Sequence, residues 1–301
     1  MLNFLPGYVT DAINNLNYNN LYEIRLRANK PVIVSYDGTY KYLSSFGLTE
    51  NEKSALIITF EEIEGIIMKA TEFSLYSVTN QLNSGYLTVE NGIRIGIAGE
   101  YVIEKGKILT IKNITSINVR IAHEIIGCGD LIYEFCEKNF LNNLLIISPP
   151  GLGKTTLLRD ISRQISLNYK NNILIIDERN EIASVNKNYS FDVGKTADVI
   201  KYSDKLTAFE VAVRSMRPDI IITDELAGEN DVLAASRAIY SGVKVIASCH
   251  LNSIDSILNK NEFKSIYENK LFDYYTILST KKIGQTQFIF DKDFNMIYGL
   301  N

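Results

Sequence analysis

The chain has 301 residues, of which 46% are hydrophobic and 22% are charged, and its formal net charge is -4. This length predicts about two domains, and the composition is that of a globular protein with enough apolar residues for two buried cores. The acidic balance excludes a globally basic nucleic-acid binder, although a local basic patch remains compatible with it.

No segment of the sequence predicts secretion or membrane insertion. The N-terminus lacks a basic stretch followed by a long apolar run, so it does not resemble a signal peptide. No apolar run approaches the ~20 residues that a membrane-spanning helix needs. The three cysteines form no C-x-x-C pair, and two histidines are too few for a histidine-rich metal site. We therefore expect a cytoplasmic protein with reduced thiols, which reaches a membrane only through partners.

The first half of the chain predicts a mixed α+β domain. Asp37-Gly38 and Asn91-Gly92 are hairpin-turn signals between apolar segments. Thr59, followed by two glutamates and by isoleucines at helical spacing, is typical of a helix start. Strands are expected at 21–27, 31–36, 85–89, 93–98 and 114–121, and a further helix at 6–16.

The second half has a different pattern, in which short continuous apolar strands alternate with helices. The strands are expected at 143–147, 173–176, 220–223 and 244–248. Such β–α alternation predicts an α/β fold with a mainly parallel sheet that is covered on both faces. A glycine-rich stretch at 121–129 separates the two patterns. We therefore expect a smaller N-terminal α+β domain at 1–122 and a second domain at 123–301.

The strongest motif lies at 144–159, where an apolar strand runs into a Pro/Gly loop and then into a helical pattern. This is the context that a Walker A loop requires, and it predicts binding and hydrolysis of a nucleoside triphosphate, with ATP expected. Glycines let the backbone N–H groups point at phosphate oxygens, and the helix presents its positive end to the same anion. Lys154 is expected to reach the β/γ-phosphates and Thr155 to ligand Mg²⁺. Ser148 stands where the usual pattern has its first glycine. The residues expected to bind nucleotide are Pro150, Gly151, Leu152, Gly153, Lys154, Thr155 and Thr156.

Two predicted strands end in carboxylates. The strand that ends at Asp224 and Glu225 resembles a Walker B strand, in which the aspartate holds Mg²⁺ and the glutamate orients the attacking water. The strand at 173–176 leads to Asp177, Glu178 and Glu181, and it fits the same description, so Asp177 is a further candidate magnesium ligand. Because parallel strands end at the same edge of a sheet, both groups are expected to flank one site. Their spacing leaves open which glutamate activates water.

One histidine and two arginines complete the candidate set. His250 follows an apolar strand, which fits a γ-phosphate sensor or, alternatively, a structural histidine. Arg94 and Arg120 lie on predicted strands of the first domain. An arginine that approaches the γ-phosphate from another domain or subunit stabilises transition-state charge, whereas a solvated or ion-paired surface arginine is the alternative for each.

Several motifs together resemble the stage III sporulation protein AA family, which is a family of cytoplasmic ATPases from endospore-forming bacteria. The matching strings extend over nearly the whole chain. They are EIRLR at 23–27, GYLTVENGIR at 85–94, PPGLGKTTLLRD at 149–160, IDERNEI at 176–182, RSMRPD at 214–219 and TDE at 223–225.

The resemblance implies membership of the secretion-ATPase superfamily, in which an N-terminal domain precedes a RecA-like core and six subunits form a ring. It implies an Asp box at 177–181, a Walker B carboxylate at Glu225 and a His box at His250, the last of these shortened here. It also implies that Arg94 and Arg120 reach the nucleotide. The implied role is to energise, with ATP and Mg²⁺, a channel between mother cell and forespore, together with membrane components and without direct nucleic-acid contact.

Two other functions remain open from the sequence. RecA-like cores also serve nucleic-acid enzymes, so a nucleotide-gated nucleic-acid-binding ATPase is one alternative, which the acidic net charge disfavours. An assembly scaffold that binds ATP with negligible turnover is the other, and the presence of both Asp224 and Glu225 argues against it.

Overall fold

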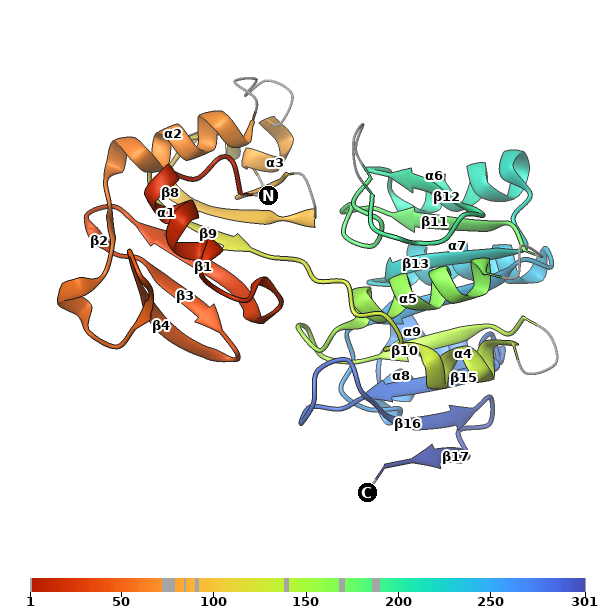
Figure 1. The fold of residues 1–301 in the computed structure, drawn as a ribbon. Helices are drawn as coiled ribbons and strands as arrows, with labels where there is room; N and C mark the ends of the chain where they lie inside the picture. The colour runs from red at the N-terminus through yellow and green to blue at the C-terminus, as the bar shows by residue number, and fades with distance from the viewer. Residues whose placement is uncertain are drawn as a thin grey trace. The chain divides into compact units, whose positions relative to one another are not determined.

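The computed structural model describes residues 2–71, 79–83, 85–89, 92–137, 141–167, 171–185 and 190–300 (Figure 1). The chain divides into two compact units, Met1–His123 and Glu124–Asn301. Each unit has its own sheet and its own buried core. Within the ranges just given, none of the helices combines the length and the apolar character needed to cross a membrane.

The first unit is built on an antiparallel sheet. Over the described residues its strand order is β5-β4-β3-β1-β9-β8-β7, and β2 and β6 form a separate small ladder. The strands are β1 (Leu21–Arg27), β2 (Lys30–Pro31), β3 (Ile33–Tyr36), β4 (Thr39–Ser44), β5 (Gly47–Thr49), β6 (Ile57–Ile58), β7 (Tyr86–Thr88), β8 (Arg94–Glu104) and β9 (Lys107–Arg120).

The helices of the first unit are α1 (Gly7–Asn14), α2 (Phe60–Ala70) and α3 (Thr79–Asn83). Helix α2 begins as the sequence predicts. The Thr59 hydroxyl accepts the Glu62 N–H at 3.2 Å, and the Glu62 carboxylate accepts the Thr59 N–H at 2.8 Å. This capping box satisfies two backbone donors that a helix start otherwise leaves without partners. The isoleucines that follow, Ile63, Ile66 and Ile67, are buried.

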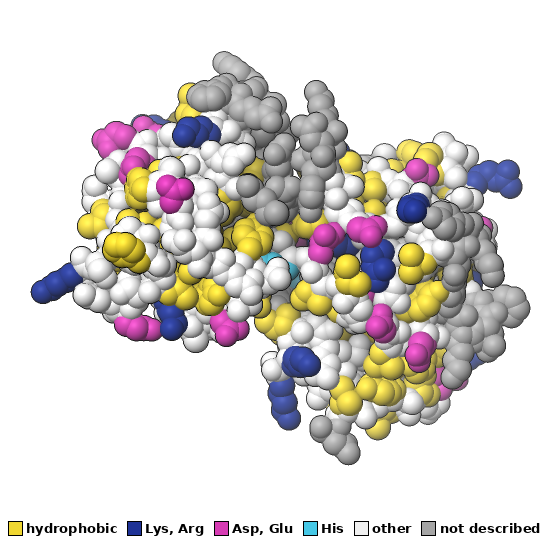
Figure 2. All heavy atoms as spheres, in the orientation of Figure 1, with side chains coloured by type: hydrophobic (Ala, Val, Ile, Leu, Met, Phe, Trp, Pro, Cys, Tyr) yellow, Lys and Arg dark blue, Asp and Glu magenta, His cyan; other side chains and the backbone are white. Residues whose placement is uncertain are grey.

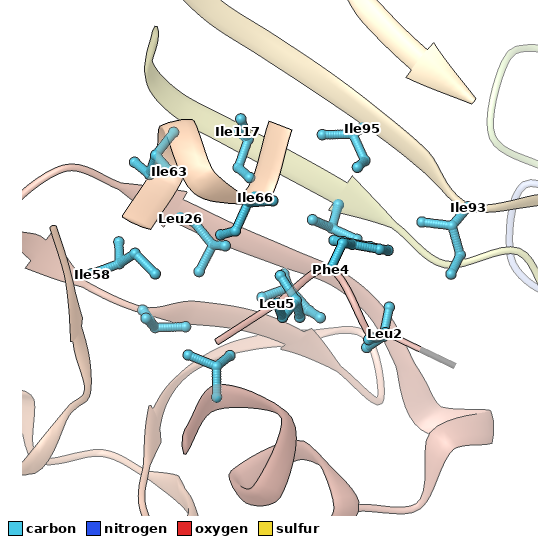
Figure 3. Packing of buried hydrophobic residues seen from close by; sticks show 14 of the residues in the cluster. Leu2, Phe4, Leu5, Leu26, Ile58, Ile63, Ile66, Ile93, Ile95 and Ile117 are labelled. Atoms are coloured by element: carbon cyan, nitrogen blue, oxygen red, sulfur yellow. The ribbon is translucent and has the colours of Figure 1, made fainter. Parts of the chain in front are cut away.

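The core of the first unit lies between α2 and the sheet. Figure 3 shows Ile63 and Ile66 of α2 close to Leu26 of β1 and Ile117 of β9. Along β1 the apolar side chains alternate with charged ones, so one face of the strand enters the core, as its sequence pattern predicts. Burying each such aliphatic side chain contributes about 1.5–3 kcal/mol.

Turn signals and strand limits in the first unit follow the sequence with two differences. Asp37 and Gly38 both have positive φ (51° and 76°) and connect β3 to β4, as the hairpin signal predicts. The expected strand at 31–36 is interrupted at Val32, whose N–H donates to the Leu56 carbonyl instead. The expected strand at 114–121 is the end of the longer β9. Asn91, of the second hairpin signal, lies outside the described residues.

The second unit is built on a mainly parallel sheet of order β12-β11-β13-β14-β10-β15-β16-β17 over the described residues. The strands β12, β11, β13, β14, β10 and β15 run parallel to one another. The strands β16 and β17 are antiparallel additions at one edge of the sheet. The strands are β10 (Leu144–Ile147), β11 (Ile173–Asp177), β12 (Ala197–Lys201), β13 (Ile220–Glu225), β14 (Lys244–Cys249), β15 (Tyr274–Leu278), β16 (Thr286–Asp291) and β17 (Met296–Gly299).

Helices cover both faces of this sheet (Figure 1). One face packs against α4 (Asp130–Glu137) and α5 (Lys154–Ser166), and the other against α6 (Lys205–Val211), α7 (Glu229–Tyr240), α8 (Asp255–Asn259) and α9 (Asn261–Glu268). Successive residues of one strand enter opposite cores: in β10, Leu144 faces α5 and Leu145 faces α7. A strand buried on both faces has no polar alternation, which explains its continuous apolar sequence. The predicted fold class is confirmed.

The strand order brings the sequence motifs to one edge. Strand β14 lies between β13 and β10, and β11 lies on the other side of β13. All four are parallel, so their carboxyl ends share an edge. The segments that follow these four strands carry the phosphate loop, both acidic strand ends and His250.

Candidate active site

The loop between β10 and α5 has the backbone of an anion-binding site. Gly151 and Gly153 adopt positive φ (79° and 91°), and Gly153 is the N-cap of α5. No side chain caps this helix start. The first N–H groups of a helix lack partners within it and carry partial positive charge, so this end of α5 can bind a phosphate oxygen.

Ser148 fits the position where the usual pattern has glycine. It is fully buried and does not adopt positive φ, so a side chain is tolerated there. Its hydroxyl donates to the Pro149 carbonyl at 2.8 Å, and its N–H donates to the Cys249 carbonyl at 3.3 Å. The serine therefore fixes the start of the loop to the end of β14.

Lys154 turns back into the loop. Its side chain is buried, with 7% of the residue exposed, and its Nζ donates to the carbonyls of Ser148 (2.7 Å) and Pro149 (2.8 Å) and to His250 Nδ1 (2.9 Å). Burial lowers the pKa of Lys154 from 10.5 to about 8, although the nearby Cys249 and Glu225 raise it. The ammonium is thus held in an environment that disfavours its charge.

His250 joins the phosphate loop to the Walker B strand. Its Nε2 lies 3.0 Å from Glu225 Oε2, while its Nδ1 lies 2.9 Å from Lys154 Nζ. A lysine ammonium only donates, so Nδ1 must accept and the proton of a neutral imidazole is on Nε2, which donates to Glu225. This chain of three side chains forms because β14, which ends next to His250, lies between β10 and β13.

A second cluster joins the two acidic strand ends. Lys205 Nζ lies 2.8 Å from Glu178 Oε2 and 2.8 Å from Asp224 Oδ1. Burial lowers the pKa of Lys205, and the two carboxylates raise it by more. Burial raises the pKa of Asp224 to about 6 against the opposing effect of Lys205. The two acidic groups therefore converge on one site.

Asp177 is held by the backbone of the loop that follows β11. It is fully buried, and its two oxygens accept the backbone N–H groups of Glu181 (2.7 Å) and Ala183 (2.9 Å). Burial raises its pKa, and these hydrogen bonds oppose the rise. Asp177 therefore anchors this loop, and its place among the magnesium ligands stays a prediction. Arg159 holds the same loop by donating to the Glu181 and Ile182 carbonyls.

Arg94 and Arg120 belong to the first unit. They lie opposite each other on β8 and β9, and Arg120 is also opposite Glu23 of β1. The Arg94 guanidinium lies 4.0 Å from the centre of the Tyr86 ring. The two arginines are therefore neighbours on one face of the antiparallel sheet.

Sequence reasoning missed two parts of the site. The loop between β15 and β16 contacts the phosphate loop, because the Gly284 N–H donates to the Leu152 carbonyl at 3.0 Å. A Cβ on Gly153 would lie 3.1 Å from the Gly284 Cα. No motif marks this contact. Sequence reasoning also missed Lys205. A lysine in the first turn of a helix opposes the helix dipole, so a lysine at that position is a weak signal that an acidic partner lies nearby.

The residues present fit a nucleotide with a divalent cation. The uncapped start of α5 and the Lys154 ammonium suit phosphate oxygens. Thr155, in the first turn of α5, and Asp224 offer oxygen ligands, which Mg²⁺ prefers. Within the described ranges, no group of three or more His, Cys, Asp or Glu side chains is placed to hold a metal. Magnesium ions in such sites usually keep several waters and bind substrate phosphates.

Comparisons with known proteins point to one family. The family model "Sporulation stage III, protein AA" matches residues 9–297. The chain is 33% identical, over an alignment of 302 residues, to stage III sporulation protein AA of Bacillus subtilis. The alignment covers 97% of this chain and 95% of that protein.

Solved structures share the fold at low sequence identity. The Yersinia pseudotuberculosis ATPase DotB matches with a TM-score of 0.61 at 16% identity, over 91% of this chain and 76% of DotB. The pilus retraction motor PilT, solved with bound ADP, matches with a TM-score of 0.56 at 17% identity, over 89% of this chain and 76% of PilT. The RecA-like P-loop fold with a preceding N-terminal domain is thereby confirmed.

Proposed function

This chain belongs to the sporulation stage III, protein AA family, and from that premise we propose that it binds ATP with Mg²⁺ at the loop 148–156 and hydrolyses it. The observation that carries the proposal is the connected series Lys154–His250–Glu225. It joins the residue suited to bind phosphate to a carboxylate suited to activate water. A site that only bound nucleotide would have no need of such a connection.

Each side chain of the site has a distinct proposed task. Lys154 and the N–H groups of 150–156 would bind the phosphates, and Thr155 and Asp224 would hold the magnesium ion. When bound, the ion neutralises charge on the phosphates and orients them for attack. Arg94 and Arg120 are proposed to approach the γ-phosphate from the first unit of the same or a neighbouring subunit.

Among the glutamates, Glu225 is the best candidate to orient the attacking water. Its carboxylate is partly exposed and accepts from His250, so it lies at the phosphate loop. Glu178 is instead paired with Lys205, and the backbone of Glu181 is tied to Asp177 and Arg159. We therefore assign Glu178 and Glu181 to the support of the site.

His250 is proposed to sense occupancy. Lys154 cannot donate to phosphate oxygens and keep all three of its present acceptors, because an ammonium has three donors. When Lys154 turns to phosphate, His250 loses its donor while keeping its hydrogen bond to Glu225. The position of Glu225 would thus respond to the nucleotide.

The wider role is proposed from the family. The chain would form a homo-oligomeric ring, with six subunits expected, and would act in the cytoplasm on membrane components of a sporulation channel between mother cell and forespore. The nucleic-acid alternative gains no support from the face shown in Figure 2, where basic and acidic side chains are interspersed.

The test compares the purified wild-type protein with two variants. Mg²⁺-dependent phosphate release and binding of a fluorescent ATP analogue are measured for wild type, Glu225→Gln and Glu181→Gln. We expect Glu225→Gln to bind the analogue as wild type does and to lose at least ~100-fold in turnover, as removal of a catalytic base does. Glu181→Gln should retain most of its turnover. Equal turnover in wild type and Glu225→Gln would refute the assignment, and no hydrolysis in wild type would refute the proposed function.

A further inference from the structure

We propose that Lys205 is a built-in counter-ion of the active site, which competes with a divalent cation for Asp224 and so makes metal binding depend on the nucleotide. The proposal rests on the proposed function in one respect, namely that Asp224 is the carboxylate that meets the magnesium ion. It adds a residue and a form of regulation that the phosphate-loop motifs do not contain.

The contacts of Lys205 are those of a buried cation with two acceptors. Its side chain is 3% exposed, and its Nζ is 2.8 Å from both Asp224 and Glu178. The two carboxylates lie at the carboxyl ends of neighbouring parallel strands, since β11 pairs with β13. Because each lies 2.8 Å from the same nitrogen, they are held within twice that distance of each other. Without the ammonium, the two negative charges would repel.

The position of Lys205 is fixed by the fold. Asp204 caps α6 by accepting the Thr207 N–H at 2.9 Å, and Ala208 and Phe209 of the same helix enter the core. The helix therefore cannot move without loss of packing. A lysine in the first turn also opposes the helix dipole, which is unfavourable. The acidic pair offsets that cost and the cost of burying the ammonium.

The consequence follows from charge. With Lys205 in place, the three groups Lys205, Asp224 and Glu178 carry a net charge of -1, and without it the two carboxylates carry -2. A free divalent cation that approaches Asp224 is repelled by the ammonium beside it. A cation that arrives with nucleotide phosphates brings its own compensating charge. Lys205 therefore selects the metal–nucleotide complex over the metal alone.

The experiment uses Mn²⁺ alone as the probe, titrated into full-length protein stripped of nucleotide and followed by electron paramagnetic resonance. Wild type should bind Mn²⁺ weakly. Lys205→Met should gain one site that is at least about tenfold tighter, because a neighbouring like charge is removed. Lys205→Met combined with Asp224→Asn should lose that site again.

Matched controls separate the charge of Lys205 from general effects. Lys201→Met removes a nearby lysine that donates to the Val185 carbonyl, and it should leave Mn²⁺ binding unchanged. Lys205→Arg keeps the charge and should not gain a site. If Lys205→Met does not fold, Lys205→Gln removes the charge while keeping a donor and should show the same gain. Circular dichroism checks folding for each variant.

The outcomes distinguish this inference from the proposed function. Tight binding of Mn²⁺ by nucleotide-free wild type, or no gain in folded Lys205→Met and Lys205→Gln, would overturn the counter-ion role. Binding of a fluorescent ATP analogue to wild type is measured in parallel. If wild type does not bind the analogue, the proposed function falls. If wild type binds it and the variants gain no Mn²⁺ site, only the inference about Lys205 falls.

Discussion

Lys154 should make the stability of the folded protein depend on pH above neutrality. Burial lowers the pKa of Lys154 from 10.5 to about 8, a difference of 2.5 units. At 1.36 kcal/mol per unit, keeping the ammonium charged at pH 7 costs the folded state about 3 kcal/mol. Lys154→Met removes this cost and also removes three hydrogen bonds worth about 1 kcal/mol each. The two effects nearly cancel at pH 7, so we expect the free energy of unfolding of the variant to lie within about 1 kcal/mol of the wild-type value.

The pH dependence identifies the cause. Between the folded pKa near 8 and the unfolded pKa of 10.5, the unfolded chain binds more protons at Lys154, so the stability of wild type rises with pH in this window. The Lys154→Met variant lacks this rise. The stability of the variant relative to wild type should therefore fall by about 2–3 kcal/mol between pH 7 and pH 10.

The assay is urea unfolding of nucleotide-free wild type and Lys154→Met at pH 7 and pH 10, followed by circular dichroism. The Tm of the variant relative to wild type should fall by about 4–12 °C between pH 7 and pH 10, since 1 kcal/mol corresponds to about 2–4 °C in a domain of this size. Added Mg²⁺ and ATP should stabilise wild type and leave the variant unchanged, because Lys154 is the proposed phosphate ligand. A stability difference between variant and wild type that is the same at both pH values would refute the reasoning.

Two further substitutions test the fold around the site. Thr59→Ala should lower the free energy of unfolding of the first unit by about 1 kcal/mol, because it removes the capping box of α2; a change below about 0.3 kcal/mol in urea unfolding would show that the cap is dispensable. Gly153→Ala should destabilise the second unit by about 1–3 kcal/mol, since φ is +91° and the new Cβ would lie 3.1 Å from Gly284. Gly151→Ala is its matched control, because a Cβ there meets no atom within 4 Å, and equal effects in calorimetry would mean that contact with Gly284 is unimportant.

Local features of the site were predictable because they depend on neighbouring residues. The glycines of the phosphate loop, the start of α5 and the acidic ends of β11 and β13 follow from strand–loop–helix patterns along the chain. The cap at Thr59 and the turn at Asp37 were predictable for the same reason. Each is determined by a few consecutive side chains and the backbone angles that they favour.

The tertiary structure decided how these pieces combine. Periodicity does not give the order of strands in a sheet, so only the position of β14 between β13 and β10 shows that His250 bridges Lys154 and Glu225. Asp177 and Asp224 end similar strands, yet one is sealed by backbone N–H groups and the other faces a buried lysine.

The sequence by itself therefore determined that this chain has a phosphate loop, two acidic strand ends and a mainly parallel α/β fold. Only the tertiary structure decided which partners each acid has and that Lys205 contacts two of the acids. The physical reason is that a motif fixes backbone geometry over a few residues. The charge, burial and partners of a side chain, in contrast, depend on residues far away in sequence, as the 2.8 Å contacts of Lys205 with Glu178 and Asp224 show.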